Sequence, residues 1–297
     1  MKWILALDLR PLCGGAVRFA IWLASASGAA DGEQFVAVHV LEEQHLLAVL
    51  RYHHLEEVEQ GARASAQAIL AAEHAGGGIS AVEVLQGTSV QEVLETARER
   101  HGAAGIIIGR AAGVAGKGVV RLGRSARRIL RSAAAPVVVV PPDLAPGDPG
   151  KGPILALTSL RADSLDACRF AAAMAQRLGR PWALLHVAPV PEEFAPPYLP
   201  VASVESMRRD FRLQGEKGLA EWIAKEGLRP DSSEVVQGRI ADSALAFARV
   251  HGSPLLVAGS QRLSTLERTL VPSVGSELAA SAPVPVAVVP PTAGTPR

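Results

Sequence analysis

Short apolar runs alternate with longer segments of mixed polarity along the whole chain. In the first half the runs are rich in β-branched residues and occupy positions 3–7, 34–40, 81–85, 106–108 and 137–140. Such runs are typical of strands that are buried on both faces of a parallel sheet. The segments between them predict helices at 14–27, 46–74, 89–101 and 125–132. Strands that alternate with helices in this way predict a doubly wound α/β domain with right-handed crossovers.

The whole pattern occurs twice. Asp8 in WILALDLR corresponds to Thr158 in ILALTSLR, 150 positions later, and His39 corresponds to His186, 147 positions later. The second copy repeats the order, with strands predicted at 154–157, 183–187, 234–236, 255–258 and 286–289, and helices predicted at 164–178, 204–226 and 241–250 and before the final strand. We therefore expect a first domain at 1–142, a Pro/Gly-rich linker at 143–152 and a second domain at 153–291.

Composition narrows the class of protein. The 297 residues exceed a typical single domain, and 48% of them are apolar, so two packed cores are expected. The net charge of +1 gives no general attraction to nucleic acid or to an anionic membrane. Cys13 and Cys168 lack metal-ligand spacing, and no apolar run reaches the roughly 20 residues that span a bilayer. The first residues meet Asp8 too early for a signal-peptide core, so we expect a cytoplasmic protein without a membrane partner.

A glycine-rich segment after the fourth predicted strand carries the clearest chemical signal. It reads GRAAGVAGKGVVRLGR and leads from a buried strand into a helix. Backbone N–H groups of such a loop, together with the helix N-terminus, form an anion-binding device. Ligands of parallel sheets bind at the carboxyl ends of the strands. Asp8, Val40 and Gly109 each lie at such an end, so we expect them to converge.

Several landmarks in this order resemble the universal stress protein family in its tandem-domain form. They are Asp after strand one, His-Val closing strand two, the glycine motif, RRILR and APVVVV. The resemblance covers nearly the whole chain twice and implies two flavodoxin-like domains of the adenine nucleotide alpha hydrolase type, each with a five-stranded parallel sheet. Many members bind ATP, with the Asp facing adenine and a Gly-x-x-Gly-x(9)-Gly-Ser/Thr loop on ribose and phosphates, and others do not. The nucleotide-binding set implied for the first domain is Asp8, Val40, Gly109, Arg110, Gly113, Gly123, Arg124 and Ser125.

The first copy departs from that motif in its register. Nine residues separate Gly113 from Gly123, as the motif requires, but three residues rather than two separate Gly109 from Gly113. Arg124 stands where Ser or Thr belongs, and Ser125 follows one position later. The loop can still form a glycine nest, and Arg124 can face a phosphate directly. We expect this copy to bind ATP or another adenine nucleotide weakly or only under some conditions.

The second copy has lost more of the motif. Gly259 is followed by Arg262 where the second glycine belongs, and Pro272 stands where the third belongs. Arg262 carries a Cβ where backbone must approach phosphate, and Pro272 has no N–H. Thr158 supplies no carboxylate at the adenine position. We therefore expect no nucleotide in the second domain.

Two interpretations are open for a cluster of arginines that lies in the helix at 125–132 and in the loop before it. Arg121, Arg124, Arg128 and Arg131 are spaced by three and four residues, and so share one face. That face either binds an anionic ligand or nucleic acid, or is solvated and paired with nearby carboxylates. The nearly neutral chain favours the second reading, so nucleic acid is not expected as a partner.

The histidines indicate structure rather than chemistry. His39 and His186 recur at the same place, but no serine or cysteine partner recurs with them, so we expect them to be hydrogen-bonded parts of the fold. His53 and His54 are adjacent, and adjacent residues on a helix point about 100° apart, which favours an exposed helix face over a metal site. We predict neither a catalytic residue nor a metal centre.

The last strand of each copy bears on assembly. The resemblance implies that 137–140 and 286–289 lie at sheet edges and pair across a two-fold axis. A bare Val-rich edge favours aggregation unless it is paired. In a tandem chain the two edges can pair with each other, giving an intrachain pseudo-dimer, and a homodimer can form in addition.

These observations favour a stress-response or sensing protein over an enzyme. Two other classes stay open: an interaction scaffold that binds no nucleotide, and a nucleotide-hydrolysing enzyme, because the same broad fold hosts such chemistry. No base paired with a nucleophile is evident near Gly109. The sequence names neither the stress, nor the ligand, nor a protein partner.

Overall fold

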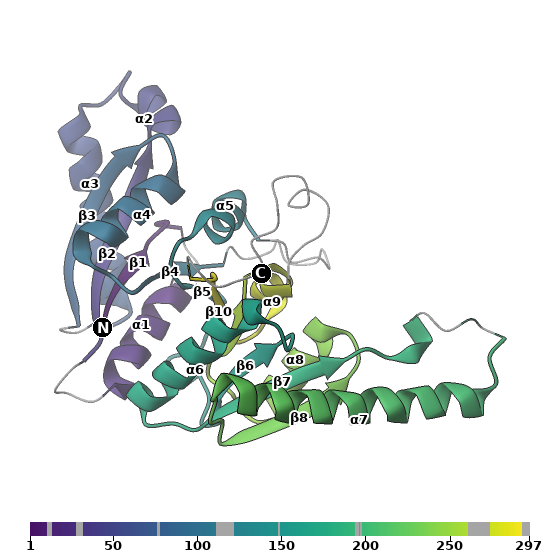
Figure 1. Cartoon of the computed structure of the whole chain (residues 1–297). Coiled ribbons are helices and arrows are strands. Elements are labelled where there is room, and N and C mark those ends of the chain that lie inside the picture. Colours follow the sequence, from purple (N-terminus) through teal and green to yellow (C-terminus); the bar gives the residue numbers. More distant parts are fainter. Residues whose placement is uncertain are drawn as a thin grey trace. The chain divides into compact units, whose positions relative to one another are not determined.

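The computed structural model describes residues 1–10, 14–27, 32–75, 78–110, 122–147, 149–193, 196, 198–260 and 274–292. The chain divides into two compact units (Figure 1). Unit 1 comprises Met1–Pro149 together with Ala279–Val288, and unit 2 comprises Gly150–Leu278 together with Val289–Arg297. The end of the second copy thus belongs by its contacts to the unit formed by the first.

Unit 1 is a doubly wound α/β fold, as predicted. Its sheet has the order β3-β2-β1-β4-β5-β10, and its strands are β1 (Lys2–Ala6), β2 (Gln34–Glu42), β3 (Ile79–Gly87), β4 (Gly105–Gly109), β5 (Val137–Val140) and β10 (Val286–Val289). The first five strands pair in parallel. Along the chain, strands β2 and β3 are added on one side of β1, and β4 and β5 are then added on its other side. This reversal is the topological switch point at which such sheets bind ligands.

The strands of unit 1 are buried because their side chains are apolar on both faces. Trp3, Ile4 and Leu5 of β1 are 0% exposed, and the four valines of β5 are almost as fully buried. The helices that cover this sheet are α1 (Gly14–Ala26), α2 (Glu43–Val49), α3 (Leu55–Ala72), α4 (Val90–His101) and α5 (Arg124–Ser132). Helix α1 packs on β1, β4 and β5, and α4 packs on β1, β2 and β3.

The expected pairing of the two last strands is confirmed. Strand β10 runs antiparallel to β5, with Val286 opposite Val139 and Val288 opposite Val137. The Val-rich edge of β5 is therefore covered by a second Val-rich strand of the same chain. This removes the exposed edge that would otherwise promote aggregation.

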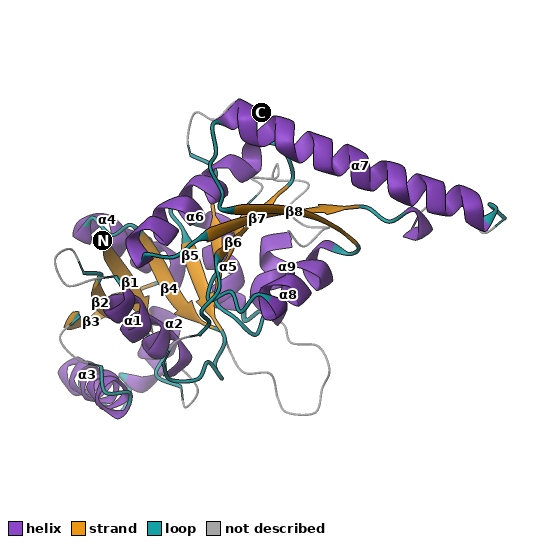
Figure 2. Cartoon of the chain, turned by 90° about the horizontal axis from the view of Figure 1, so that it is seen from below, coloured by secondary structure: helices purple, strands orange, loops and turns teal. Residues whose placement is uncertain are grey.

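Unit 2 repeats the order of the first four strands. Its sheet reads β9-β6-β7-β8, formed by β6 (Ile154–Thr158), β7 (Trp182–Ala188), β8 (Ser232–Gln237) and β9 (Leu256–Gly259). Its helical segments are η1 (Ala162–Ser164), α6 (Leu165–Leu178), η2 (Pro191–Glu193), α7 (Val201–Glu226) and α8 (Ile240–Val250), together with α9 (Val274–Ser281) as far as Leu278. Helix α7 reaches well beyond the strands of its own unit (Figures 1 and 2).

One predicted helix is wrong. The segment 46–74 was expected to be continuous, but it forms the two helices α2 and α3 with a turn between them. His54 adopts an extended conformation and starts α3, where Glu57 Oε2 accepts a hydrogen bond from the His54 backbone N–H at 3.2 Å. This local cap competes with continuation of the helix. At the other end His74 adopts a left-handed conformation, with φ of 54°.

Helix α4 begins where the sequence predicted. Ser89 is its N-cap residue in extended conformation, although its side chain makes no capping hydrogen bond. The helix ends at Gly102, whose φ of 59° is readily available to glycine. No described helix is both long and apolar enough to cross a bilayer.

Cys168 lies in the core of unit 2. It is on α6 and is 0% exposed. Burial raises the pKa of its thiol from the ordinary value of 9.0 to about 12, because the charged thiolate is poorly solvated there. Cys168 therefore acts as a small packing residue of this core.

We expect the Cys168 thiol to react with a chromogenic disulfide reagent near pH 8 only when unit 2 unfolds. The measurement uses a Cys13→Ser chain, so that Cys168 is the only thiol, with and without urea. Because the folded pKa is raised, the contribution of this group to stability is lost as the pH rises from 9.0 towards about 12. Rapid labelling of the native chain would contradict the burial of α6.

Candidate functional site

The carboxyl ends of three neighbouring strands meet in unit 1, as expected. Ala6 of β1 pairs with Val38 of β2 on one side and with Ile108 of β4 on the other. The next residues along each strand therefore lie at one edge of the sheet. These residues include Asp8, Val40 and Gly109.

Asp8 sits in a tight turn that presents it to solvent. Its Oδ1 accepts a hydrogen bond from the Arg10 backbone N–H at 3.1 Å. Leu9 between them has φ of 55°, a left-handed conformation that is uncommon for a residue with a Cβ. The Asp8 side chain is exposed at the strand edge rather than buried in the core. An exposed carboxylate next to a residue with left-handed backbone, at a switch point, is a candidate ligand contact.

His39 has a structural role at this edge. Its Nδ1 donates to the Leu7 carbonyl at 2.8 Å, which fixes the imidazole beside the end of β1. The equivalent bond recurs in unit 2, where His186 Nδ1 donates to the Thr158 carbonyl at 3.0 Å. Both histidines are thus hydrogen-bonded parts of the fold, as expected.

The hydrogen bonds made by His39 and His186 correct the alignment of the two copies that was expected from the sequence. Because His39 corresponds to His186, their acceptors Leu7 and Thr158 also correspond. The strand register agrees, since Ala6 pairs with Val38, one position before the histidine, and Thr158 pairs directly with His186. The expectation that Thr158 stands in the place of Asp8 is therefore wrong by one residue.

The counterpart of Asp8 in unit 2 is Ser159. The left-handed residue that follows Asp8 is Leu9, and the left-handed residue that follows Ser159 is Leu160, with φ of 59°. Ser159 is exposed like Asp8, and its Oγ donates to Asp163 Oδ1 at 2.7 Å. Unit 2 thus carries a hydroxyl at this position, and its nearby carboxylate comes from the next turn of the chain.

In both units the glycine that ends the fourth strand lies close to the segment that follows the first strand. In unit 1 a Cβ built on Gly109 would lie 3.9 Å from Ala16 Cβ of α1. A Cβ built on Gly259 would lie 2.7 Å from the Asp163 carbonyl oxygen and 3.4 Å from Ser164 Cα. In unit 2 the segment η1 thus packs directly against the strand end.

A hydroxyl network holds η1 in that position. Thr158 Oγ1 and Ser164 Oγ are 3.0 Å apart, and Ser164 Oγ also donates to the Arg161 carbonyl at 2.8 Å. Thr158 and Ser164 are both buried. These hydroxyl groups therefore hold the backbone of η1 against the end of β9.

The Arg110 side chain is hydrogen-bonded to backbone carbonyls within unit 1. Its backbone N–H donates to the Val140 carbonyl at 2.7 Å. One guanidinium nitrogen, Nη1, donates to the carbonyls of Ala280 at 3.0 Å and Ala282 at 2.8 Å, with Ala279 at 3.5 Å. Burial lowers the pKa of the Arg110 guanidinium, and the Asp143 carboxylate partly opposes this shift.

Three further predicted residues lie where α5 begins. Gly123 is the N-cap of α5, and its carbonyl accepts from the Arg127 backbone N–H at 3.0 Å. Arg124 and Ser125 follow in the first turn and are exposed. Gly113 lies outside the described residues. The helix N-terminus and Arg124 both contribute positive charge here.

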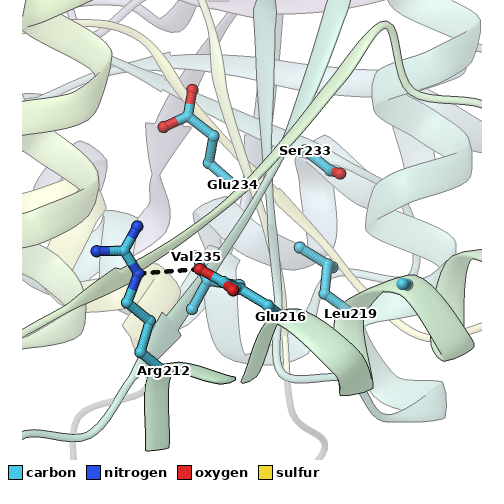
Figure 3. Close-up of a pocket in the computed structure, with 7 residues that line it drawn as sticks. Arg212, Glu216, Leu219, Ser233, Glu234 and Val235 are labelled. Atoms are coloured by element: carbon cyan, nitrogen blue, oxygen red, sulfur yellow. Dashed lines mark hydrogen bonds and ion pairs between the residues drawn. The ribbon is translucent and has the colours of Figure 1, made fainter. Parts of the chain in front are cut away.

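A separate cavity of about 330 Å³ lies in unit 2 beside the middle of β8 (Figure 3). Helix α7 contributes Arg212, Glu216, Leu219 and Ala220, and β8 contributes Ser233, Glu234 and Val235. Arg212 Nε donates to Glu216 Oε1 at 2.9 Å, so these charges neutralise each other. Sequence analysis missed this cavity, because its only signal is one i,i+4 ion pair on a helix. Among the described residues, no group of three or more His, Cys, Asp or Glu side chains is placed to hold a metal ion.

Two copies of one doubly wound α/β domain, each with a switch point at the carboxyl edge of its sheet, define a tandem α/β fold. The family model described as the universal stress protein family matches residues 1–141 and again 152–290, so the chain belongs to this family. No curated protein matches the chain.

Solved structures share the fold over nearly the full length. A universal stress protein from Archaeoglobus fulgidus DSM 4304 is 16% identical, with a TM-score of 0.62 over 97% of this chain and 98% of its own. A functionally unknown protein from Pseudomonas aeruginosa PAO1 is 14% identical, with a TM-score of 0.61 over 98% of this chain and 92% of its own. At such identities the likeness shows the fold alone.

Proposed function

We propose that this protein is a cytoplasmic stress-response or sensing protein, not an enzyme, and that it binds an adenine nucleotide such as ATP in unit 1 only. Membership of the universal stress protein family supports the general class. The nucleotide would occupy the carboxyl edge of β1, β2 and β4. In this proposal its occupancy changes local order and so alters assembly or partner binding.

The proposed roles follow from position. Asp8 faces the adenine, and the backbone at Val40 lies beside it on the next strand. Gly109 and Gly113 allow close approach of the backbone to the ribose, and Gly123 does so at the phosphates. Arg124 and Ser125, both exposed at the start of α5, offer a guanidinium and a hydroxyl to the phosphates.

One observation carries the choice of unit 1 over unit 2. The strand-end position that holds the Asp8 carboxylate in unit 1 holds the Ser159 hydroxyl in unit 2. Unit 2 thus lacks the charged acceptor that this proposal places at the adenine. In unit 2 the backbone of η1 also packs against Gly259, so a ligand there would have to displace η1 and its buried hydroxyl network.

We expect calorimetric titration with ATP to give one site per chain. The Asp8→Ala variant should weaken binding by roughly tenfold or more, because a hydrogen bond to a charged group contributes about 1.5–3 kcal/mol. The matched control is Ser159→Ala, which changes the corresponding residue of unit 2 and should leave ATP affinity unchanged.

Other results would overturn the proposal. Two sites per chain, or equal losses in both variants, would contradict the assignment to unit 1. No binding and no thermal shift with ATP, ADP or cyclic AMP would favour the interaction scaffold. Release of inorganic phosphate from ATP, abolished by a change at the strand edge, would show an enzyme instead.

A further inference from the structure

Helix α5 presents four arginines on one face. Arg124, Arg127, Arg128 and Arg131 are spaced i, i+3, i+4 and i+7, and all four are exposed. At 100° per residue this spacing keeps them within one arc of the helix. The opposite side packs into unit 1 through Ile129 and Leu130, which are 5% and 6% exposed. We refer to these four residues as the α5 arginine face.

The α5 arginine face is not neutralised within the described part of the chain. None of its four guanidinium groups is paired with a described carboxylate, and the first turn of α5 has no acidic residue. Other arginines do pair with carboxylates, such as Arg18 with Glu73 at 2.7 Å. The face is thus exposed to solvent, as expected, but the expected pairing with nearby carboxylates is not found among the described residues. The sequence from 109 to 124, which leads into α5, also lacks acidic residues.

This arrangement costs the isolated protein some stability. Like charges at i,i+3 and i,i+4 on a helix repel each other. Arg124 in the first turn is also unfavourable with the helix dipole, whose N-terminal end is positive. An anionic partner that lies along this face would relieve both the repulsion among the arginines and the unfavourable interaction of Arg124 with the helix dipole.

We propose that the α5 arginine face docks an acidic, carboxylate-rich segment of a partner protein. The planar fork of arginine binds carboxylates in a bidentate manner, and clusters of arginine are a recurrent means of recognising acidic motifs. The face is roughly 10 Å long, which suits a short acidic segment. This inference does not depend on nucleotide binding in unit 1.

Two other kinds of polyanion fit less well. Nucleic acid binding draws on an extended basic surface, and this chain has a net charge of only +1. Helix α5 has no aromatic side chain on which a base could stack. An anionic membrane would favour exposed apolar residues beside the charges, but Ile129 and Leu130 are buried.

The test measures anisotropy of a fluorescein-labelled glutamate-rich peptide at low ionic strength, with the full chain. We expect binding that weakens as salt is added. The double variant Arg127→Gln, Arg128→Gln should weaken it by roughly tenfold or more. The control is Arg208→Gln, Arg212→Gln on α7, which removes the same charge from arginines paired with Glu192 and Glu216, and it should change affinity by less than about twofold.

Arginine and glutamine have similar helix propensities, so the α5 variant should keep its circular dichroism spectrum. Absence of peptide binding, or equal losses in the α5 and α7 variants, would overturn the proposal. The same measurement is made with a single-stranded DNA oligomer and with phosphatidylserine vesicles. The choice of partner would be overturned if either bound more tightly than the peptide and its binding depended on Arg127 and Arg128.

Discussion

Replacing Gly105 with alanine is expected to lower the free energy of unfolding of unit 1 by about 3 kcal/mol. The new Cβ would lie 2.5 Å from the Pro136 carbonyl oxygen and 2.6 Å from Trp3 Cζ3. Trp3 is 0% exposed, so its ring cannot shift without displacing other buried side chains. The Pro136 carbonyl accepts from the Ile106 backbone N–H at 3.0 Å, so shifting it disturbs the pairing of β4 with β5.

The matched control is Gly61→Ala, the same chemical change in the middle of α3. No heavy atom lies within 4 Å of a Cβ built there. Alanine in an open helical position should raise the free energy of unfolding by about 0.5–1 kcal/mol, because glycine loses more backbone entropy on folding. Urea unfolding followed by tryptophan fluorescence should move the two midpoints in opposite directions. An unchanged midpoint for Gly105→Ala would contradict the close packing of β4 on Trp3 and Pro136.

The strands could be predicted because their sequences leave few alternatives. The run of four valines in β5 is too apolar for a loop and too short and β-branched for an independent helix, and it forms a strand at the predicted residues. The repeat made the second copy predictable from the first. The break between α2 and α3 was missed, because the hydrogen bond from His54 to Glu57 is a weak local signal within a segment of good helix formers.

The candidate site was less predictable than the fold. The gapless match of ILAL in both copies aligns Thr158 with Asp8, whereas the hydrogen-bond register aligns Ser159 with it. A shift of one residue at a strand end depends on pairing with a neighbouring strand, which local sequence does not encode. The packing of Asp163 against Gly259 depends in the same way on contacts distant in sequence.

The role of Arg110 likewise depends on contacts that are distant in sequence. It follows Gly109 in the glycine-rich segment, and from sequence it belongs with the phosphate contacts. Its acceptors Ala279, Ala280 and Ala282 lie 169 to 172 residues later in the chain. Only the folded chain brings them together, within unit 1.

Replacing Arg110 with methionine is therefore expected to destabilise unit 1 by about 3 kcal/mol, because hydrogen bonds to a charged group contribute about 1.5–3 kcal/mol each and do not add fully. The change leaves the Ala280 and Ala282 carbonyls without this donor. Arg110→Lys should lose less, since an ammonium supplies donors but not the planar fork. The control Arg209→Met removes the same charge from an exposed position on α7 and should leave the unfolding midpoint unchanged.

A second readout separates this structural role from a ligand role. The Arg110 acceptors lead into β10, which pairs with β5, so Arg110→Met should accelerate amide hydrogen exchange in Val286–Val289 while α7 exchanges as before. If Arg110 instead contacted a phosphate, the variant would lose ATP affinity and keep both the unfolding midpoint and the exchange of β10. We expect the opposite combination, because Nη1 of the guanidinium already donates to the carbonyls of Ala280 at 3.0 Å and Ala282 at 2.8 Å, which ties the side chain to the segment before β10.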